Sequence, residues 1–317
     1  MAFKVLITPR SFETVKDKCI GLLEKENFEV VMNPYGRVLT EEELAGLIEE
    51  MDGIIVGIDP VTSKVLEKAK RLKVISKYGV GVDNIDLEKA KEKGILVTNT
   101  PGANSNAVAE LTLGLIFTVL RKINLSDRKT REGSWERFVG YELSGKTLGI
   151  IGTGNIGRRL VKLLKGFDLR ILCYDKDLDL EWAAEEGIIY VSLEELLKNS
   201  DVISIHMPLT KETYHFISDK ELSFVKPGAV IINTSRGGII DEMALYNALK
   251  EGKLLGAGLD VFEKEPPIDS PLLNLENVVM TSHIGAHTQE ATENMAKMAV
   301  ENLISVLKGE KPKFLVE

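Results

Sequence analysis

The chain has 317 residues, enough for two domains, since a single hydrophobic core rarely extends past about 250 to 300 residues. Its 44% hydrophobic and 28% charged residues are typical of a globular protein. A formal net charge of −8 argues against nucleic acid or a membrane surface as partner, because both attract basic protein surfaces. The N-terminus lacks a signal-peptide pattern and the most apolar stretch is too short to span a bilayer, so we expect a cytoplasmic protein. Cys19 and Cys173 show no paired spacing, and we expect no metal site.

Short apolar strands alternate with helical segments through the first hundred residues. Strands are expected at residues 3–8, 29–32, 53–56, 72–76 and 94–98, and helices after the first strand, at 40–50 and at 63–70. Thr40 followed three residues later by Glu43 predicts a capping box at the start of the second helix. Continuous apolar strands separated by helices predict a parallel sheet covered on both faces.

The pattern restarts near residue 102 with a long helix at residues 106–121. A polar stretch follows at residues 128–141, and it contains Trp135 and Phe138. Strand and helix repeats then run from residue 146 to about residue 284, and a last helix is expected at residues 289–307. This pattern of strands and helices therefore predicts two α/β domains.

A glycine-rich motif, Gly152-Thr-Gly154-Asn-Ile-Gly157, follows an apolar strand and opens an amphipathic helix that we place at residues 158–167. Gly152 permits a tight turn, Gly154 lets the backbone approach a pyrophosphate, and Gly157 allows close packing of helix and sheet. The start of the helix offers unpaired N–H groups to the phosphates. This context predicts a dinucleotide site.

Asp175 ends the next strand, about twenty residues beyond the glycines. A carboxylate at this place can accept hydrogen bonds from the hydroxyl groups of the adenosine ribose, and it would repel the 2′-phosphate of NADP. Lys176 weakens that preference slightly. We therefore expect the cofactor to be NAD.

Three side chains downstream suit hydride transfer between a secondary alcohol and a ketone. Arg236, Glu265 and His283 each follow an apolar strand, where open α/β sheets bind ligands. Histidine is the natural proton donor and acceptor near neutral pH, and the planar guanidinium of arginine can bind both oxygens of a carboxylate. A carboxylate paired with the imidazole would orient the ring and favour its charged form.

Other histidines offer alternatives for the acid/base role. His206 also ends a strand and could face the site. His215, expected at a polar helix start, and His287 are expected at the surface or behind the site. On residue types alone, Arg236 could be a structural cation and Glu265 a loop charge.

The sequence resembles the D-isomer-specific 2-hydroxyacid dehydrogenase family along nearly its whole length. The motifs that carry the resemblance are Lys93-Gly-Ile-Leu-Val-Thr-Asn-Thr-Pro-Gly102, Val108-Ala-Glu110, Trp135-Glu136, Ser144-Gly-Lys-Thr-Leu148, Arg236-Gly-Gly-Ile-Ile-Asp241 and Leu259-Asp-Val-Phe262. Within the family the match is best with members that act on 3-phosphoglycerate.

The resemblance implies a role for each site residue. Arg236 would bind the substrate carboxylate, and Glu265 would pair with His283, the acid/base. Substrate contacts would come from the backbone of Val80 and Gly81 and from Asn104. Cofactor contacts would come from the motif glycines with Asn155 and Ile156, from Asp175, from Asp260 at the nicotinamide amide, and from Thr234, Ser235 and Gly285.

The resemblance also implies the architecture and the partners. Two doubly wound parallel-sheet domains are expected, with a Rossmann NAD domain at residues 102–286 inserted into a flavodoxin-like substrate domain formed by residues 1–101 and 287–317. The arm around residues 128–141 would form the surface of a homodimer.

The choice of substrate depends on the loop at residues 55–61, which departs from the family members that act on 3-phosphoglycerate. Those members typically have an arginine there that holds the phosphate, whereas this chain has Asp59 and no cation. Lys77 could supply the charge, or it could be a solvated surface residue. The sequence therefore predicts a 2-hydroxy or 2-keto acid substrate, with 3-phosphoglycerate as first choice. Glyoxylate, hydroxypyruvate or another short 2-keto acid is the alternative, and an NAD-sensing binding protein is the alternative from another class.

Overall fold

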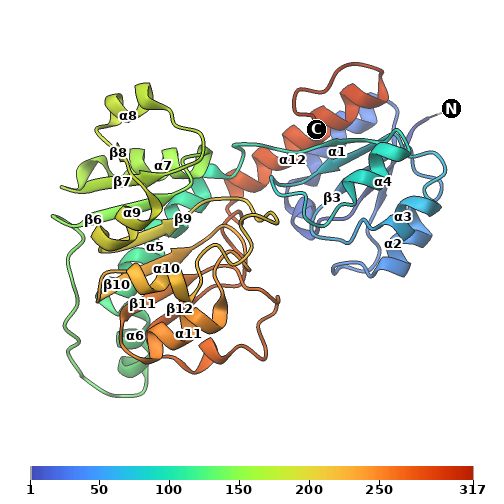
Figure 1. Ribbon diagram of the computed structural model, residues 1–317. Helices are drawn as coiled ribbons and strands as arrows, with labels where there is room; N and C mark the ends of the chain where they lie inside the picture. Colours follow the sequence, from blue (N-terminus) through green and yellow to red (C-terminus); the bar gives the residue numbers. More distant parts are fainter. Residues whose placement is uncertain (1, 317) are drawn as a thin grey trace. The chain divides into compact units, whose positions relative to one another are not determined.

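The computed structural model describes residues 2–316, which form two compact units (Figure 1). Unit 1 combines Met1–Asn104 with Ala286–Glu317, and unit 2 is Ser105–Gly285. The expected domain limits lie within a few residues of these limits.

Unit 1 is built on a sheet with the strand order β2-β1-β3-β4-β5, and every neighbouring pair is parallel. This order is that of flavodoxin-like folds. The strands are β1 (Lys4–Ile7), β2 (Glu29–Met32), β3 (Gly53–Val56), β4 (Val74–Lys77) and β5 (Leu96–Thr98). The last two are displaced by about two residues from the expected ranges at one end.

Helices cover both faces of this sheet, so the central strands are buried on both sides. One face packs against α1 (Lys16–Lys25), the 3-10 helix η1 (Arg10–Val15) and α12 (Gln289–Leu307). The other face packs against α2 (Glu41–Ile48), α3 (Ser63–Lys68) and α4 (Leu87–Glu92). The Thr40–Glu43 capping box is present at the start of α2. The C-terminal helix α12 thus completes the core that the first hundred residues begin.

Unit 2 contains a parallel sheet in the order β12-β11-β10-β9-β6-β7-β8, an extended Rossmann order. The order reverses between β6 and β9, and ligands of doubly wound sheets bind beside such a reversal. The strands are β6 (Thr147–Ile151), β7 (Arg170–Tyr174), β8 (Ile189–Tyr190), β9 (Val202–Ile205), β10 (Ala229–Asn233), β11 (Leu254–Leu259) and β12 (Val278–Met280).

Two helical layers cover the sheet of unit 2. One contains α5 (Ser105–Arg121), α7 (Asn155–Leu163) and α8 (Leu180–Glu186), and the other contains α9 (Leu193–Asn199), α10 (Asp219–Phe224) and α11 (Glu242–Lys250). Two short 3-10 helices are η2 (Leu164–Gly166) and η3 (Pro271–Asn274). Helix α7 begins at Asn155 rather than at residue 158, because Gly154 itself is the N-cap. The motif glycines therefore lie directly at the helix start.

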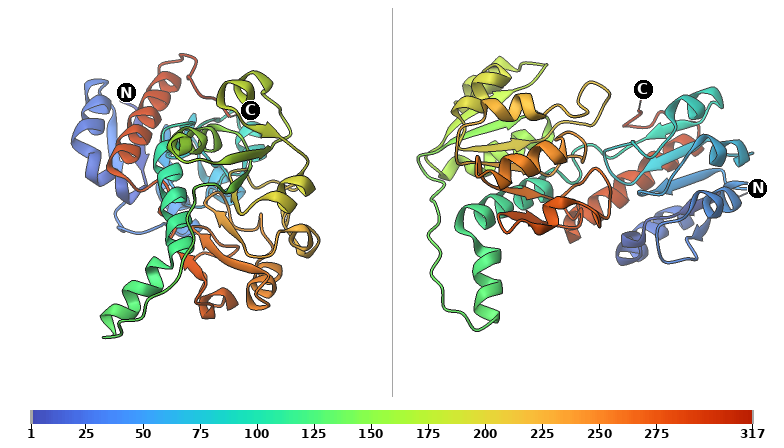
Figure 2. Two further views of the ribbon diagram at one scale, coloured as in Figure 1. Left: turned by 90° about the vertical axis from the view of Figure 1, so that its left-hand side faces the viewer. Right: turned by 60° about the horizontal axis from the view of Figure 1, so that its bottom comes forward.

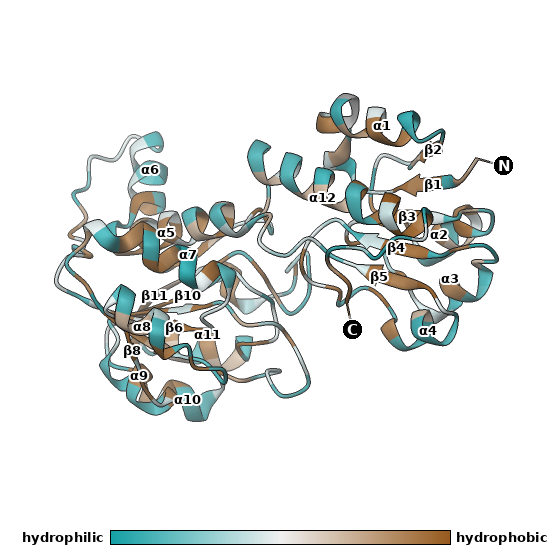
Figure 3. Ribbon diagram, turned by 90° about the horizontal axis from the view of Figure 1, so that it is seen from above, coloured by the Kyte–Doolittle hydropathy of each residue, from teal (hydrophilic) through white to brown (hydrophobic). Residues whose placement is uncertain are grey.

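The segment after α5 extends away from the sheet of unit 2 (Figure 2). It consists of α6 (Ile123–Arg131), which buries none of its residues, and an irregular stretch up to β6. Much of α6 is hydrophilic, whereas hydrophobic residues concentrate in the strands of both sheets (Figure 3). Trp135 and Val139 in this stretch are 82% and 84% exposed. Across residues 2–316, the helices are too short or too polar to cross a bilayer.

Candidate active site

Two of the expected catalytic side chains are in direct contact within unit 2. His283 follows β12 and Glu265 follows β11, and the imidazole Nδ1 lies 2.8 Å from Glu265 Oε2. The other carboxylate oxygen of Glu265 accepts a hydrogen bond from the Phe262 amide at 3.1 Å. Within residues 2–316, no group hydrogen-bonds to His283 Nε2. The carboxylate thus fixes one nitrogen of the ring, and the other nitrogen is left available for a further contact.

Arg236 follows β10, and its positive charge acts on the Glu265 carboxylate. Its Nη1 donates to the Ser235 carbonyl at 2.7 Å, which fixes the guanidinium close to the strand end. Burial by itself raises the pKa of Glu265. The hydrogen bond and charge of His283, the Phe262 amide and the Arg236 guanidinium outweigh burial and hold that pKa below its usual value. The carboxylate is therefore ionised at neutral pH.

Asp260 binds residues on both sides of His283. Its Oδ1 accepts from the Thr281 hydroxyl at 2.6 Å and from the Ile284 amide at 2.8 Å, and its Oδ2 accepts from the Gly285 amide at 2.8 Å. Asp260 is 1% exposed, so these bonds are shielded from water. The expected contact of Asp260 with the nicotinamide amide stays a prediction, since both carboxylate oxygens already bind this loop.

The glycine motif has the geometry that a bound dinucleotide requires. A Cβ on Gly152 would lie 2.5 Å from the His206 carbonyl oxygen, and one on Gly157 would lie 2.3 Å from the Gly152 carbonyl oxygen. Gly152 also has a φ of +98°, which side chains rarely allow. In contrast, a Cβ on Gly154 would meet nothing within 4 Å, so its backbone is open to an approaching pyrophosphate. Asn155 and Ile156 occupy the first turn of α7.

Asp175 lies at the end of β7, beside the glycine motif. Its Oδ2 accepts from the amide and the hydroxyl of Thr153, at 2.6 Å and 2.9 Å, and its Oδ1 accepts from the Asp177 amide at 3.1 Å. Partial burial raises the pKa of Asp175, but these hydrogen bonds outweigh it and the pKa lies below its usual value. An ionised, oriented carboxylate at this place fits a ribose and not a 2′-phosphate.

The remaining unit 2 residues are bound within the protein. The Thr234 hydroxyl lies 2.8 Å from that of Thr112, and the Ser235 hydroxyl donates to Asn233 Oδ1 at 2.7 Å. Gly285 packs close to Asp260, because a Cβ there would lie 3.0 Å from Asp260 Oδ2. These positions shape the strand ends around Arg236 and His283.

The expected substrate residues of unit 1 follow β4 and β5. Val80 and Gly81 lie in the loop after β4, where the Val80 carbonyl accepts from Asn99 Nδ2 at 2.9 Å. Asn104 Oδ1 is buried with no partner among the described residues. Lys77 is not a solvated surface residue: it is buried, and its Nζ donates to the Gly57 carbonyl at 2.5 Å and to Asn84 Oδ1 at 2.7 Å.

The other histidines occupy different environments. Burial lowers the pKa of His206 to about 3, so its ring is neutral at working pH and unsuited to exchange protons there. His287 is exposed. His215 lies in a loop before α10, not at a helix start, and it contacts Asp241 and Glu263. No sequence pattern predicts this cluster, because its members lie in separate loops.

Comparison with known proteins agrees with this geometry. The family model "D-isomer specific 2-hydroxyacid dehydrogenase, NAD binding domain" matches residues 113–285. A glyoxylate reductase of Thermococcus litoralis is 48% identical over 279 residues, which is 85% of this chain and 84% of that protein. A D-3-phosphoglycerate dehydrogenase of Methanocaldococcus jannaschii is 48% identical over 311 residues, which is 97% of this chain but 58% of that protein.

A solved structure is similar along the same length. It is a D-lactate dehydrogenase from Aquifex aeolicus in complex with NAD and lactic acid, with a TM-score of 0.84, 33% identity, and 96% coverage of both chains. Matches in both sequence and fold, together with the glycine motif and the strand-end side chains, place this chain in the D-isomer-specific 2-hydroxyacid dehydrogenase family, as an NAD-dependent enzyme.

Proposed function

We propose that this enzyme reduces a short, unphosphorylated 2-keto acid, such as glyoxylate or hydroxypyruvate, to the 2-hydroxy acid, which has the D configuration where C2 is a stereocentre. The observation that carries the proposal is the loop after β3. Ile58 in this loop is 68% exposed, whereas Asp59 is 2% exposed. The Asp59 carboxylate is turned inward, where it accepts hydrogen bonds from the Thr8 hydroxyl and the Leu39 amide.

A loop of this kind presents an apolar side chain where a phosphate dianion would need a cation. No lysine or arginine occurs at residues 53–61. We assign Lys77 to the support of this loop, since its ammonium binds the Gly57 carbonyl. A phosphate there would lose charge-assisted hydrogen bonds, which are among the stronger polar contacts. The short keto acid is therefore favoured over 3-phosphoglycerate, which the sequence put first.

The proposed mechanism assigns one task to each side chain of the group. When bound, NADH supplies the hydride that goes to C2 of the keto acid. His283 Nε2 donates the proton that the keto oxygen takes up, so the products are the hydroxy acid and NAD⁺. Glu265 stabilises the charged imidazole and keeps Nε2 directed outward. Arg236 binds the substrate carboxylate and polarises the keto oxygen.

Further contacts are proposed on the same basis. The amides of Val80 and Gly81 and the side chain of Asn104 would bind the substrate, and the buried, unpartnered Oδ1 of Asn104 supports such a contact. The exposed apolar residues of the arm after α6, among them Trp135 and Val139, support a homodimer. A cytoplasmic location stays a prediction.

A second candidate substrate is 3-phosphoglycerate, because the relative from Methanocaldococcus jannaschii bears that name at 48% identity. To separate the two candidates, the loss of NADH absorbance is measured with glyoxylate, with hydroxypyruvate and with phosphohydroxypyruvate as substrate. We expect kcat/KM to be higher for the unphosphorylated acids, and the reverse ranking would refute the proposal. Ile58→Arg should shift the preference toward phosphohydroxypyruvate, and Ile58→Gln is the matched control.

The acid/base role is tested with His283→Ala. We expect turnover to fall by roughly two to four orders of magnitude, the range of general acid–base catalysis, while the Kd for NADH changes by no more than a few-fold. Unchanged turnover would remove His283 from the mechanism.

A further inference from the structure

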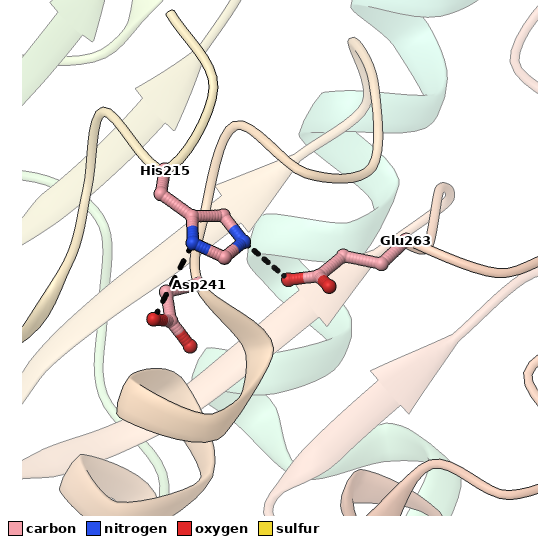
Figure 4. Close-up of side chains that lie close together, drawn as sticks. All are labelled: His215, Asp241 and Glu263. Carbon is pink, nitrogen blue, oxygen red and sulfur yellow. Dashed lines mark hydrogen bonds and ion pairs between the residues drawn. The ribbon is translucent and has the colours of Figure 1, made fainter.

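A cluster of His215, Asp241 and Glu263 joins three loops of unit 2 (Figure 4). His215 lies in the loop between β9 and α10, Asp241 is the N-cap of α11, and Glu263 lies in the loop after β11. His215 Nε2 is 3.0 Å from Glu263 Oε1, and His215 Nδ1 is 3.5 Å from Asp241 Oδ2. About a third of each side chain is exposed, so the cluster is partly shielded from water.

The geometry is that of an imidazole held between two carboxylates, and not that of a metal site. The carboxylates approach opposite nitrogens of the ring, as Figure 4 shows. A metal ion on one nitrogen, at about 2.0 Å, could not also bind both carboxylates at similar distances. His215 Nε2 is within hydrogen-bond distance of Glu263 Oε1, whereas Asp241 Oδ2 makes a longer polar contact, at 3.5 Å, with the other ring nitrogen. We therefore interpret the cluster as a polar bridge in which one imidazole joins two carboxylates.

Each end of the bridge is anchored by further hydrogen bonds. Asp241 Oδ1 caps α11 by accepting from the amides of Met243 and Ala244, at 3.0 Å and 3.1 Å. Glu263 Oε1 also accepts from the Glu242 amide at 3.1 Å. The ring of His215 stacks on Tyr214 with centroids 4.0 Å apart. The bridge therefore connects fixed points rather than mobile side chains.

Two loops that the bridge joins also carry side chains of the proposed active site, Arg236 in one and Glu265 in the other. The His215 amide donates to the Gly238 carbonyl at 2.7 Å, two residues after Arg236, and Glu263 lies two residues before Glu265. The backbones of the two loops are in close contact, because a Cβ on Gly237 would lie 1.8 Å from the Phe262 carbonyl oxygen. A shift of one loop must therefore move the other.

We propose that His215 is a positioning residue, which ties the loop of Arg236 to the loop of Glu265 and so sets the distance between the guanidinium and the His283–Glu265 pair. The inference rests on the proposed roles of Arg236 and Glu265. Displacements of about 1 Å in a catalytic group can cost on the order of a hundredfold in rate, so a modest loosening of the bridge should be measurable.

The test is His215→Asn, because asparagine tolerates the left-handed backbone at this position, where φ is +51°. We expect kcat/KM for the keto acid to fall by about tenfold, as expected for a displacement of less than 1 Å. The Kd for NADH and the Tm should remain close to those of the parent. The effect of Glu263→Gln should not add to that of His215→Asn, because both break the same bridge. His215→Arg, whose guanidinium can donate to both carboxylates, should retain part of the activity that His215→Asn loses.

The matched control is Lys264→Asn. It removes the ion pair of Lys264 with Asp269, which lies in the same loop but does not reach the loop of Arg236. Equal kcat/KM for His215→Asn and Lys264→Asn would overturn the inference. A loss of activity in His215→Asn that comes with weaker NADH binding and a lower Tm would also overturn it. Activity that is lost with a chelator and restored by Zn²⁺ only when His215 is present would show a metal site instead.

The assays use whichever 2-keto acid the substrate panel identifies. A wrong substrate assignment therefore leaves this test intact. A His283→Ala enzyme with full turnover would remove the proposed function, whereas the comparison of His215→Asn with Lys264→Asn decides only the role of the bridge.

Discussion

His283 adopts a left-handed backbone conformation, with a φ of +55°, that few residues other than glycine adopt. Asp260 encloses this residue with bonds to the Thr281 hydroxyl and to the amides of Ile284 and Gly285. Strained backbone persists only where its surroundings fix it. The direction of the imidazole therefore depends on a buried carboxylate that is 23 residues earlier than His283 in the sequence.

Asp260→Asn tests this dependence. The amide group of asparagine has a single acceptor, so at least one buried N–H loses its partner, at a cost of about 1–3 kcal/mol in the free energy of unfolding. We expect kcat to fall by about tenfold or more, and a urea titration together with steady-state kinetics measures both effects. Thr281→Val, which removes one of the three bonds, should have a smaller effect. A rise in the Kd for NADH with unchanged stability would instead favour the contact with the nicotinamide.

Asp175→Ala tests the ribose contact. We expect the Kd for NADH to rise by about tenfold or more, the loss of one to two hydrogen bonds to a charged group, while the Kd for NADPH rises less or falls. Fluorescence titration with both cofactors measures the two constants. Equal weakening of both would contradict the assignment. Because Thr153 donates to the carboxylate, the Tm should be recorded alongside.

At the scale of elements, α7 sits against the end of β6 with no room for a side chain between them. A Cβ on Gly157 would lie 2.3 Å from the Gly152 carbonyl oxygen and 3.3 Å from Ile150 Cγ2. Because Gly157 has no side chain, the N-terminus of α7 can lie this close to the strand. Its N–H groups are then placed to bind the phosphates.

Gly157→Ala should push α7 away from the sheet. We expect the free energy of unfolding to fall by about 1–3 kcal/mol, the usual cost of overpacking, and the affinity for NADH to fall with it. The control is Gly166→Ala in η2, where a Cβ would meet nothing within 4 Å and the effect should stay within about 0.5 kcal/mol. Thermal unfolding and NADH titration of both variants make the comparison. Similar values for the two would show that α7 is not held by this contact.

At the scale of the whole molecule, the chain forms unit 1, leaves it for unit 2, and returns with α12. The core of unit 1 includes α12, because Met295, Ala299 and Leu303 of this helix pack into it. The Ser76 hydroxyl also donates to the Ala299 carbonyl at 2.8 Å. Unit 1 therefore depends on residues from both ends of the sequence.

The exposed arm after α6 gives a prediction at the same scale. Trp135→Asp should convert a dimer into monomers, because a charge would have to be buried at the interface that we propose. Size-exclusion chromatography with light scattering measures the mass. Leu180→Asp, which also places a charge on an exposed apolar residue, is the control and should leave the mass unchanged. A Trp135→Asp protein with the parental mass would contradict the assignment of the arm.

The sequence by itself determined the two parallel sheets, the dinucleotide motif and the strand ends that carry Arg236, Glu265 and His283. These features depend on local patterns: continuous apolar strands, glycine spacing, and polar residues directly after a strand. Such patterns can be identified in a sequence because each depends only on residues that are close together along the chain.

Only the tertiary structure decided how side chains from separate loops combine. Asp260 binds the loop of His283, Lys77 and Asp59 are turned inward, and His215 bridges Asp241 and Glu263. Each of these contacts joins residues that the sequence keeps apart, and none follows a fixed spacing. Parallel strands bring their carboxyl ends to one edge of the sheet, but the direction of each side chain there depends on the packing of all the loops together.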